Sequence, residues 1–436
     1  MDYITLLILL SILWTAINVL KLGSRKPAPL PPGPCGLPII GNMLQLGTLP
    51  HQALAKLSKT YGPVMSLKLG IMTTIVFSSS DVAEEVFKKH DKNFANRTIF
   101  DAARALDHHK RSIAWQPADA HWRFLRKICS TKIFTMKRIE ASQGLRQRKV
   151  QELLDHVLDC SQTGRAAHIA QAGFTTSLNF ISNTIFSMDL AHYDSKMSHE
   201  FMGLVRGLFQ VIVKPNLADY FPILRFLDPQ GIRRQTEFRM ENLMAIFNDI
   251  VNKRVESDGH GDNDDMLSTL IKLHHENESE FSRKDLNVLL LDMFVAGTDT
   301  ASTTLEWTMA ELLGLPKTLA KAQAELGGVM SKAKMVQESD ISKLSYLQAV
   351  VKESLRLPPI VPILKHKSAA EVEISGFTIP RDAQIFGEIV LLSASLDISS
   401  PNFEFAFMEA YLKWHLGLPR HPTIRQETTS KKLKMG

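Results

Sequence analysis

The sequence predicts a mainly α-helical protein with small β-sheets, in which one large domain follows an N-terminal transmembrane helix. Helical patterns fill most of the chain after residue 122, and a long buried helix is predicted from Ser282 to Gly314. Strand patterns are confined to short stretches within residues 64–77 and 371–380. The 436 residues contain no repeats and no sign of a second core, so we expect a single large domain.

Composition and charge exclude several classes of partner. The apolar content of 44% is ample for a large core, and a net charge of +6 is only mildly basic. Lysine and arginine form no run with interleaved aromatic residues, so we expect no nucleic-acid partner. The three cysteines, Cys35, Cys129 and Cys160, form neither a disulfide framework nor a zinc-finger spacing. We therefore expect the soluble part of the chain to face a reducing compartment.

Residues 1–22 are predicted to form a membrane anchor. The apolar run within it, Tyr3 to Leu22, has about the length of one bilayer-spanning helix. Only Asp2 precedes it, whereas Lys21, Arg25 and Lys26 lie at its end, so the positive-inside rule places the bulk of the chain in the cytosol. A cleaved signal peptide is the alternative, but the segment has no basic start and no small-residue cleavage site.

Short elements follow the anchor in order. Residues 23–41 contain six prolines and are predicted to form a stiff, extended hinge that holds a globular body off the membrane. Helices are predicted over 51–61 and 81–90, with a strand pair around Gly70 between them. A second strand pair is predicted over 371–380, with Ser375 and Gly376 at the bend.

The middle of the body has one irregular segment. Residues Phe100 to Pro117 lack a clean period and are predicted to form a long loop, in which His108 and His109 are solvated rather than ligands. From Trp122 to about Lys253 helical patterns dominate, and they are interrupted at two proline-containing sites.

The predicted central helix begins with a capping box formed by Ser282 and Asp285 and ends at Gly314. Its first half is apolar nearly all round, as expected of a helix buried in a core. Residues 296–300, Ala-Gly-Thr-Asp-Thr, are poor mid-helix choices. Either a ligand approaches the backbone here and protons are handled, or a Gly/Thr kink serves packing. The pattern alone leaves both interpretations open.

Two short motifs flank the central helix. Trp122 and Arg126 lie four residues apart on one helix face, where an indole N–H and a guanidinium could hold an anionic group. Glu353 and Arg356 lie three residues apart and could pair in the interior. Each motif alone is equally consistent with an ordinary pair on a helix surface.

The order of these features resembles that of the membrane-bound cytochrome P-450 monooxygenases. Anchor, PPGPCGLP, WRFLR, AGTDT and ESLR occur in that order, followed by an apolar strand that contains proline. Longer stretches such as FVAGTDTASTTLEW and VQESDISKLSYLQAVVKESLRL resemble plant terpenoid hydroxylases of the geraniol hydroxylase type. The resemblance covers residues 1 to about 386, so residues 42–386 correspond to the catalytic domain.

The resemblance implies roles for individual residues around a heme cofactor. Ala296 and Gly297 would lie over the heme and leave room for dioxygen, and Asp299 and Thr300 would relay protons during oxygen activation. The remaining roles are binding of the heme propionates, by Trp122, Arg126 and His366, and a buried stabilising pair, formed by Glu353 and Arg356.

The resemblance also implies a reaction and its partners. The chain would hydroxylate a small, apolar, terpenoid-like substrate with O2, using electrons from NADPH that a membrane-bound flavoprotein reductase supplies. It would lie in the endoplasmic reticulum membrane as a single-pass protein. The substrate pocket would draw on four segments, namely residues 100–117, 201–219, the helix face around Asp292 and Val295, and the apolar run 360–364.

The chain departs from the family at its C-terminal end. The family holds its iron by a cysteine thiolate in a loop of the form F-x-x-G-x-R-x-C-x-G, and this chain has no cysteine after Cys160. We therefore assign no metal ligand. The resemblance stops after Phe386, so residues 387–436 are a divergent tail, and the fold is expected to be C-terminally truncated or aberrant.

Two accounts of the tail stay open. The tail could be a frame shift, a retained intron or a gene-model error, in which case the true product is a complete monooxygenase. Alternatively, the tail is real and the chain is a catalytically inactive, membrane-anchored relic. A secreted or soluble binding protein is a third class, which the anchor disfavours.

Overall fold

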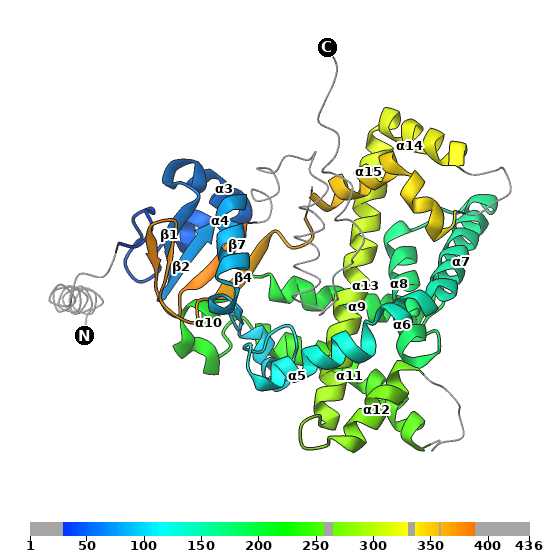
Figure 1. Ribbon diagram of the computed structural model, residues 1–436, viewed down its shortest axis with the longest axis horizontal. Coiled ribbons are helices and arrows are strands. Elements are labelled where there is room, and N and C mark those ends of the chain that lie inside the picture. The colour runs from blue at the N-terminus through cyan, green and yellow to red at the C-terminus, as the bar shows by residue number, and fades with distance from the viewer. Residues whose placement is uncertain (1–28, 257–264, 330–335, 357–358, 389–436) are drawn as a thin grey trace, which may run out of the picture.

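The computed structural model describes residues 29–256, 265–329, 336–356 and 359–388 (Figure 1). Strands β1, β2, β4 and β7 lie together at one end of the molecule, and the long helices α7, α8 and α11–α15 lie at the other end (Figure 1). The predicted anchor, residues 1–22, and the tail beyond residue 388 lie outside the described residues. Within the described ranges, no helix has both the length and the apolarity needed to cross a bilayer.

The larger sheet joins strands from both ends of the described chain, in the order β1-β2-β7-β4-β3. Strands β2 and β7 pair in parallel, with Ile75 opposite Ile385, and the other neighbours pair antiparallel. The predicted strand pair around Gly70 is confirmed as β1 and β2, and Gly70 turns at a φ of 57°. The strand bounds are Val64–Leu69 for β1, Met72–Phe77 for β2, Asn96–Arg97 for β3, Ile363–Lys367 for β4 and Gln384–Glu388 for β7.

A second, two-stranded sheet confirms the predicted C-terminal hairpin. Strands β5, Val372–Ile374, and β6, Phe377–Ile379, pair antiparallel. Ser375 and Gly376 form the bend, with φ values of 49° and 81°. Positive φ at both central residues is the geometry whose twist matches that of the flanking strands.

Helices make up most of the remaining chain, so the predicted fold class, mainly α with small β-sheets, is confirmed. The predicted helix over 51–61 is α3, and that over 81–90 is α4 continued by a π-helical turn. The α-helices are α2 Met43–Leu46, α3 Pro50–Tyr61, α4 Ser80–Glu84, α5 Ala120–Ile128, α6 Met136–Ala141, α7 Gln143–Gln162, α8 Ile169–Phe186, α9 Lys196–Ile212, α10 Leu217–Tyr220, α11 Ile232–Glu256, α12 Met266–Glu276, α13 Arg283–Gly314, α14 Pro316–Val329 and α15 Ser345–Arg356.

Helix α13 is the predicted central helix, and it crosses the helical part of the molecule (Figure 1). Ser282 caps its first turn, and the predicted capping box with Asp285 is present in both directions. Its main packing partner is α8. Phe294 sits at the centre of the largest core cluster, where its ring lies 4.7 Å from that of Phe247 and 5.4 Å from that of Phe186.

The predicted long loop over 100–117 is wrong in part. It contains a 3₁₀ segment, η3 Ala102–Lys110, whose helical geometry breaks at Ala105, Leu106 and Asp107. Leu106 and Asp107 adopt positive φ, which costs free energy for residues other than glycine. Periodicity fails to reveal this segment because its turns are short and kinked.

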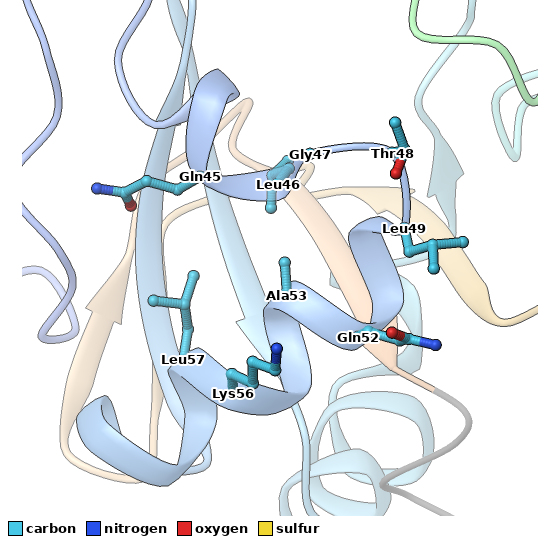
Figure 2. Close-up of a pocket in the computed structure, with 9 residues that line it drawn as sticks. All are labelled: Gln45, Leu46, Gly47, Thr48, Leu49, Gln52, Ala53, Lys56 and Leu57. Carbon is cyan, nitrogen blue, oxygen red and sulfur yellow. The ribbon is translucent and has the colours of Figure 1, made fainter.

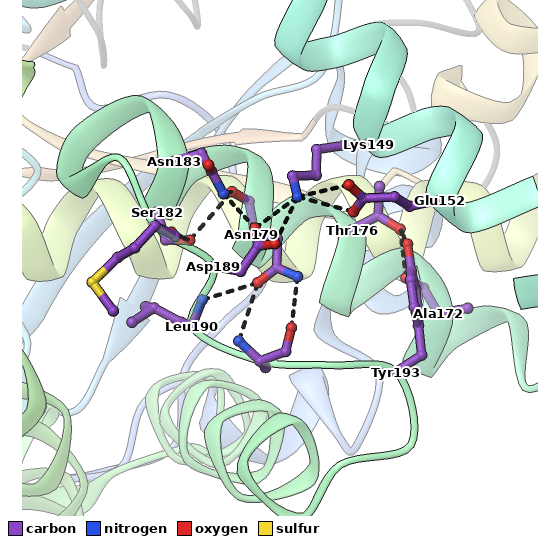
Figure 3. Close-up of polar contacts among 12 residues, drawn as sticks. Lys149, Glu152, Ala172, Thr176, Asn179, Ser182, Asn183, Asp189, Leu190 and Tyr193 are labelled. Carbon is purple, nitrogen blue, oxygen red and sulfur yellow. Dashed lines mark hydrogen bonds and ion pairs between the residues drawn. The ribbon is translucent and has the colours of Figure 1, made fainter. Parts of the chain in front are cut away.

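A buried polar network fixes the junction of α7 and α8 (Figure 3). The side chain of Lys149 is only 4% exposed, and its Nζ lies 2.9 Å from a carboxylate oxygen of Glu152 and 2.7 Å from one of Asp189. The amide of Asn179 accepts from the backbone N–H groups of Leu190 and Ala191. A buried ammonium is tolerated when carboxylates pair with it, so this network is structural.

Candidate functional site

Residues 296–300 of α13 present a hydroxyl, that of Thr300, and a carboxylate, that of Asp299, within one turn of helix. The Oγ1 of Thr300 donates to the carbonyl of Ala296 at 2.6 Å, which satisfies the hydroxyl within the helix. Asp299 is ion-paired with Arg206 of α9, whose Nε lies 2.9 Å from its carboxylate. Arg206 also reaches Glu306 at 3.3 Å, so one guanidinium holds two acids of the same helix. Ala296 is exposed, which leaves the helix face beside Thr300 open.

Gly297 lies against α8, whereas its neighbour Ala296 is exposed. A Cβ on Gly297 would lie 2.5 Å from Cδ1 of Ile181 in α8, so the missing side chain lets the two helices approach. Gly173 of α8 lies at the same crossing, where a Cβ would meet Leu305 at 3.1 Å. The structure thus gives Gly297 a packing position against α8 and leaves Ala296 as the small residue on the open face. The packing interpretation is therefore supported at Gly297, and the ligand interpretation stays a prediction for Ala296.

Helix α5 carries the predicted anion-binding pair. Its N-cap Asp119 accepts from the N–H of Trp122, which fixes the start of the helix. The Arg126 guanidinium stacks over the indole of Trp122 at 5.0 Å. Burial lowers the pKa of Arg126, because it disfavours the charged form. The indole Nε1 donates to the carbonyl of Ile113 at 2.9 Å, so its single N–H serves the preceding loop.

His366 lies on β4 and is 3% exposed. Its Nε2 lies 2.9 Å from an Arg97 nitrogen, and its Nδ1 lies 2.8 Å from the carbonyl of Phe94. Because a guanidinium only donates, Nε2 is the acceptor and Nδ1 carries the proton, so the imidazole is neutral. Burial, helped by the Arg97 charge, lowers the pKa of His366 well below its usual value. Sequence reasoning missed Arg97, whose position beside His366 depends on pairing of β3 with β4.

Glu353 and Arg356 pair as predicted but are not buried as predicted. Arg356 donates from Nε at 2.7 Å and from a terminal nitrogen at 2.6 Å to the two carboxylate oxygens. The Glu353 side chain is 53% exposed, and α15 contains no buried residue. The expected burial requires other chain segments to cover α15, and the described residues do not do so.

The prediction that His108 is solvated is wrong. His108 is 3% exposed, and its Nε2 lies 2.9 Å from the carboxylate of Asp292 in α13. Seven residues earlier in the helix, Asp285 accepts from Arg111 at 2.7 Å. Burial alone would raise the pKa of Asp285, but hydrogen bonds from Ser282 and Arg111 hold it below the ordinary value. Asp292, which was expected to face substrate, instead holds the 100–117 segment against α13.

A surface pocket of about 390 Å³ lies between α2 and α3 (Figure 2). Its lining mixes polar and aliphatic side chains, among them Gln45, Leu46, Gln52 and Leu57. None of the predicted site residues lines it, so it is separate from the site on α13.

Whether a heme would fit depends on two kinds of group: cations for its carboxylates and a cysteine thiolate for its iron. The cation Arg126 on α5 and the open face of α13 suit the propionates and the oxygen side of a heme. The thiolate ligand does not fit. Cys129 is buried, and burial, with the nearby Asp292 charge, raises its thiol pKa to about 12, so it stays protonated at neutral pH.

The other cysteines also do not supply the ligand. Cys160 is 2% exposed, with its Sγ 3.8 Å from His156 Nε2 in the same helix, and Cys35 lies in the proline-rich hinge. Among the residues that the structure describes, no three His, Cys, Asp or Glu side chains cluster as a metal site. The described residues therefore supply a cation, Arg126, that would suit the carboxylates of a heme, and no cysteine suited to be its thiolate ligand.

Comparison with known proteins gives a consistent result over most of the chain. The family described as Cytochrome P450 matches residues 31–397. Cytochrome P450 76T24 of Catharanthus roseus is 49% identical over 390 residues, which cover 88% of this chain and 78% of the relative. Geraniol 8-hydroxylase of Swertia mussotii is 43% identical over 394 residues, covering 90% and 80%. Inactive cytochrome P450 76AD1 of Beta vulgaris is 45% identical over 392 residues, covering 88% and 94%.

Proposed function

The chain belongs to the cytochrome P450 family, and from this membership we propose that its described body is that of a hydroxylase for a small, lipophilic, terpenoid-like substrate. Members of the family are heme-dependent monooxygenases, so the chain is by family an oxidoreductase. The electrons would come from NADPH through a membrane-bound flavoprotein reductase, with the protein anchored in the endoplasmic reticulum membrane by residues 1–22.

The observation that carries the proposal is the arrangement on α13. An exposed small residue, Ala296, lies beside a hydroxyl, Thr300, and the next carboxylate, Asp299, is held by Arg206. When bound, the heme supplies the oxygen chemistry. Thr300 and Asp299 would move protons to its oxygen side, where a carboxylate can pass protons from solvent to the hydroxyl.

The cofactor's carboxylates would bind at residues of α5 and β4. We propose Trp122, Arg126 and His366 for this role. Arg126 of α5 would pair with the carboxylates directly, and Trp122 would position Arg126 by stacking, because its N–H already donates to Ile113. His366 would act through Arg97, because both of its ring nitrogens already have partners within the protein.

The proposed substrate class rests on the apolar residues 360–364 and on the names of two relatives. Geraniol 8-hydroxylase and ferruginol synthase, which is 43% identical over 383 residues, are named for terpenoid chemistry. Residues 360–364, Ile-Val-Pro-Ile-Leu, supply apolar side chains suited to a hydrocarbon body.

A second candidate function is a catalytically inactive, membrane-anchored P450-like protein. The cysteine chemistry favours it, because the one cysteine beside α5 is a buried, protonated thiol and the sequence has none after Cys160. Without a thiolate, the electron donation that promotes O–O cleavage is lost. One relative carries the name inactive, so such a chain has a counterpart in this family.

One experiment separates the two candidates. The chain as given is expressed beside a chimera in which residues 387–436 are replaced by the corresponding C-terminal part of the Catharanthus relative. We expect the chain as given to lack the reduced-plus-CO band of thiolate-ligated heme, and the chimera to show it and to hydroxylate geraniol with a reductase. A thiolate band from the chain as given would overturn the inactive candidate. A chimera with the band and no turnover of any terpenoid would overturn the proposed substrate class.

A further inference from the structure

One carboxylate of α13 gathers three donors from a short stretch of the preceding segment. Asp292 accepts from His108 Nε2 at 2.9 Å and from the backbone N–H of Ile113 at 2.9 Å. The hydroxyl of Ser112 lies 3.0 Å and 2.8 Å from its two oxygens. The Asp292 side chain is 10% exposed, so these bonds form largely out of water, where charge-assisted hydrogen bonds are strong.

The same stretch continues the contact to α5. The peptide of Ile113 donates its N–H to Asp292, while the Ile113 carbonyl accepts from the indole of Trp122 at 2.9 Å. The indole in turn lies under the Arg126 guanidinium at 5.0 Å. A continuous line of contacts therefore runs from α13 through Ile113 and Trp122 to Arg126.

A second attachment of the same segment does not reach Ile113. Asp285 holds Arg111 at 2.7 Å and lies 3.3 Å from His121 Nε2. It therefore reaches Arg111 in the segment and His121 at the start of α5, with no bond to the peptide that Trp122 uses. Asp285 thus touches α5 directly at His121, whereas Asp292 reaches α5 through Ile113.

We propose that Asp292 is a positioning residue, which places the Arg126 guanidinium through Ile113 and Trp122. The assignment of Arg126 to the cofactor rests on the proposed function, whereas the coupling of α13 to α5 rests on the contacts alone. Asp292 would thereby fix the position of the 100–117 segment and, through it, the position of Arg126. Loosening the segment would then also loosen Arg126.

Hydrogen exchange on the full-length chain tests the coupling directly. The variants are Asp292→Ala, which removes the acceptor, Asp292→Asn, which keeps one oxygen for Ile113, and Glu311→Gln, an exposed carboxylate on the same helix. We expect Asp292→Ala to speed exchange on the order of tenfold in peptides covering 108–115 and 120–126, since tenfold corresponds to the loss of about one hydrogen bond. Asp292→Asn should have a smaller effect, and Glu311→Gln none.

Two outcomes would overturn the proposal. Faster exchange in 108–115 with no change in 120–126 would show that the segment moves without α5. An equal response in 120–126 to Arg111→Gln, which weakens the attachment of the segment to Asp285 and keeps the Asp285 contact to His121, would show that any loosening of the segment suffices. Asp292→Asn keeps the test valid if the alanine variant does not fold.

Binding of hemin, followed by tryptophan quenching, supplies the functional arm. Asp292→Ala and Trp122→Phe should each weaken binding several-fold, and the double variant should be no weaker than the single ones, because both break the same line of contacts. Additive losses would contradict the coupling. A wild-type chain that binds no hemin would overturn the cofactor assignment of the proposed function, while the exchange result would still decide the coupling.

Discussion

The two halves of α13 differ in burial although they belong to one uninterrupted helix. Every side chain from Asp285 to Phe294 is buried except that of Asp292, whereas Leu312 is the only buried side chain from Thr303 to Gly314. The helices beside the second half are equally exposed, since α14 buries only Ala322 and α15 buries none.

The difference shows that helix length and helix burial have separate causes. The capping box at Ser282 fixes where α13 begins, and this is local. Burial depends on partners. Helix α11 and the 100–117 segment pack on the first half, whereas α8 and α9 also reach the second half, at Leu305 and Glu306, and leave the rest of it uncovered. The segment 296–300 lies at the boundary, where the packed helix opens to one side.

The largest expected effect of a substitution is in the buried half. Phe294→Ala removes a ring that is 0% exposed and packed against Phe186, Phe201 and Phe247, so we expect a loss of about 3–5 kcal/mol in the free energy of unfolding. Trp307→Ala, in the exposed half, removes a larger side chain that is 47% exposed and should cost far less. Urea unfolding followed by circular dichroism measures both. Equal losses would show that the exposed half is covered in solution.

The next effect tests the helix crossing at the boundary. Gly297→Ala places a Cβ 2.5 Å from Ile181 Cδ1, and we expect overpacking to cost about 1–3 kcal/mol. Ile181→Val removes that Cδ1, so the double variant should recover most of the loss. Gly314→Ala is the control, because a Cβ there meets nothing within 4 Å, and it should stabilise by up to about 1 kcal/mol through helix propensity. A destabilised Gly297→Ala that Ile181→Val fails to rescue would point away from this contact.

The features that the sequence predicted correctly are those that depend on residues close together in the chain. The bounds of α13, its capping box and the hairpin at Ser375 and Gly376 follow from residue type and spacing, and all are confirmed. The Trp122–Arg126 and Glu353–Arg356 contacts also follow from helical spacing and are present.

The errors concern contacts between distant parts of the chain. His108 is buried against Asp292, 184 residues later, which accepts a hydrogen bond from its Nε2, and no periodicity within 100–117 carries that information. The side of α13 on which Gly297 lies depends on where α8 packs. The burial of Glu353 depends on segments that would cover α15, which helical spacing does not describe.

The buried His366 should make the free energy of unfolding depend on pH. Its folded-state pKa lies well below 6.5 because of burial and Arg97, so the unfolded chain binds more protons than the folded one below that value. Stability should therefore fall as the pH falls below about 6.5 toward the folded-state pKa. Unfolding free energies from pH 7.5 to 5 measure the slope, and His366→Gln should flatten it. An unchanged slope in the variant would assign the effect to other groups.

The smallest expected effect is at the exposed pair on α15. Glu353 is 53% exposed, and exposed ion pairs contribute about 0.2–1 kcal/mol even with two hydrogen bonds, so Glu353→Gln should cost no more than that. The loss should shrink further at high salt, where exposed charges are screened.

In the chimera that carries the relative's C-terminal part, the same substitution would cost several-fold more if that part covers α15, because removing one partner of a covered pair leaves the other charge buried. An equally small loss in both backgrounds would show that α15 stays exposed in the complete fold. A large loss in the chain as given would instead show that its own tail covers the pair.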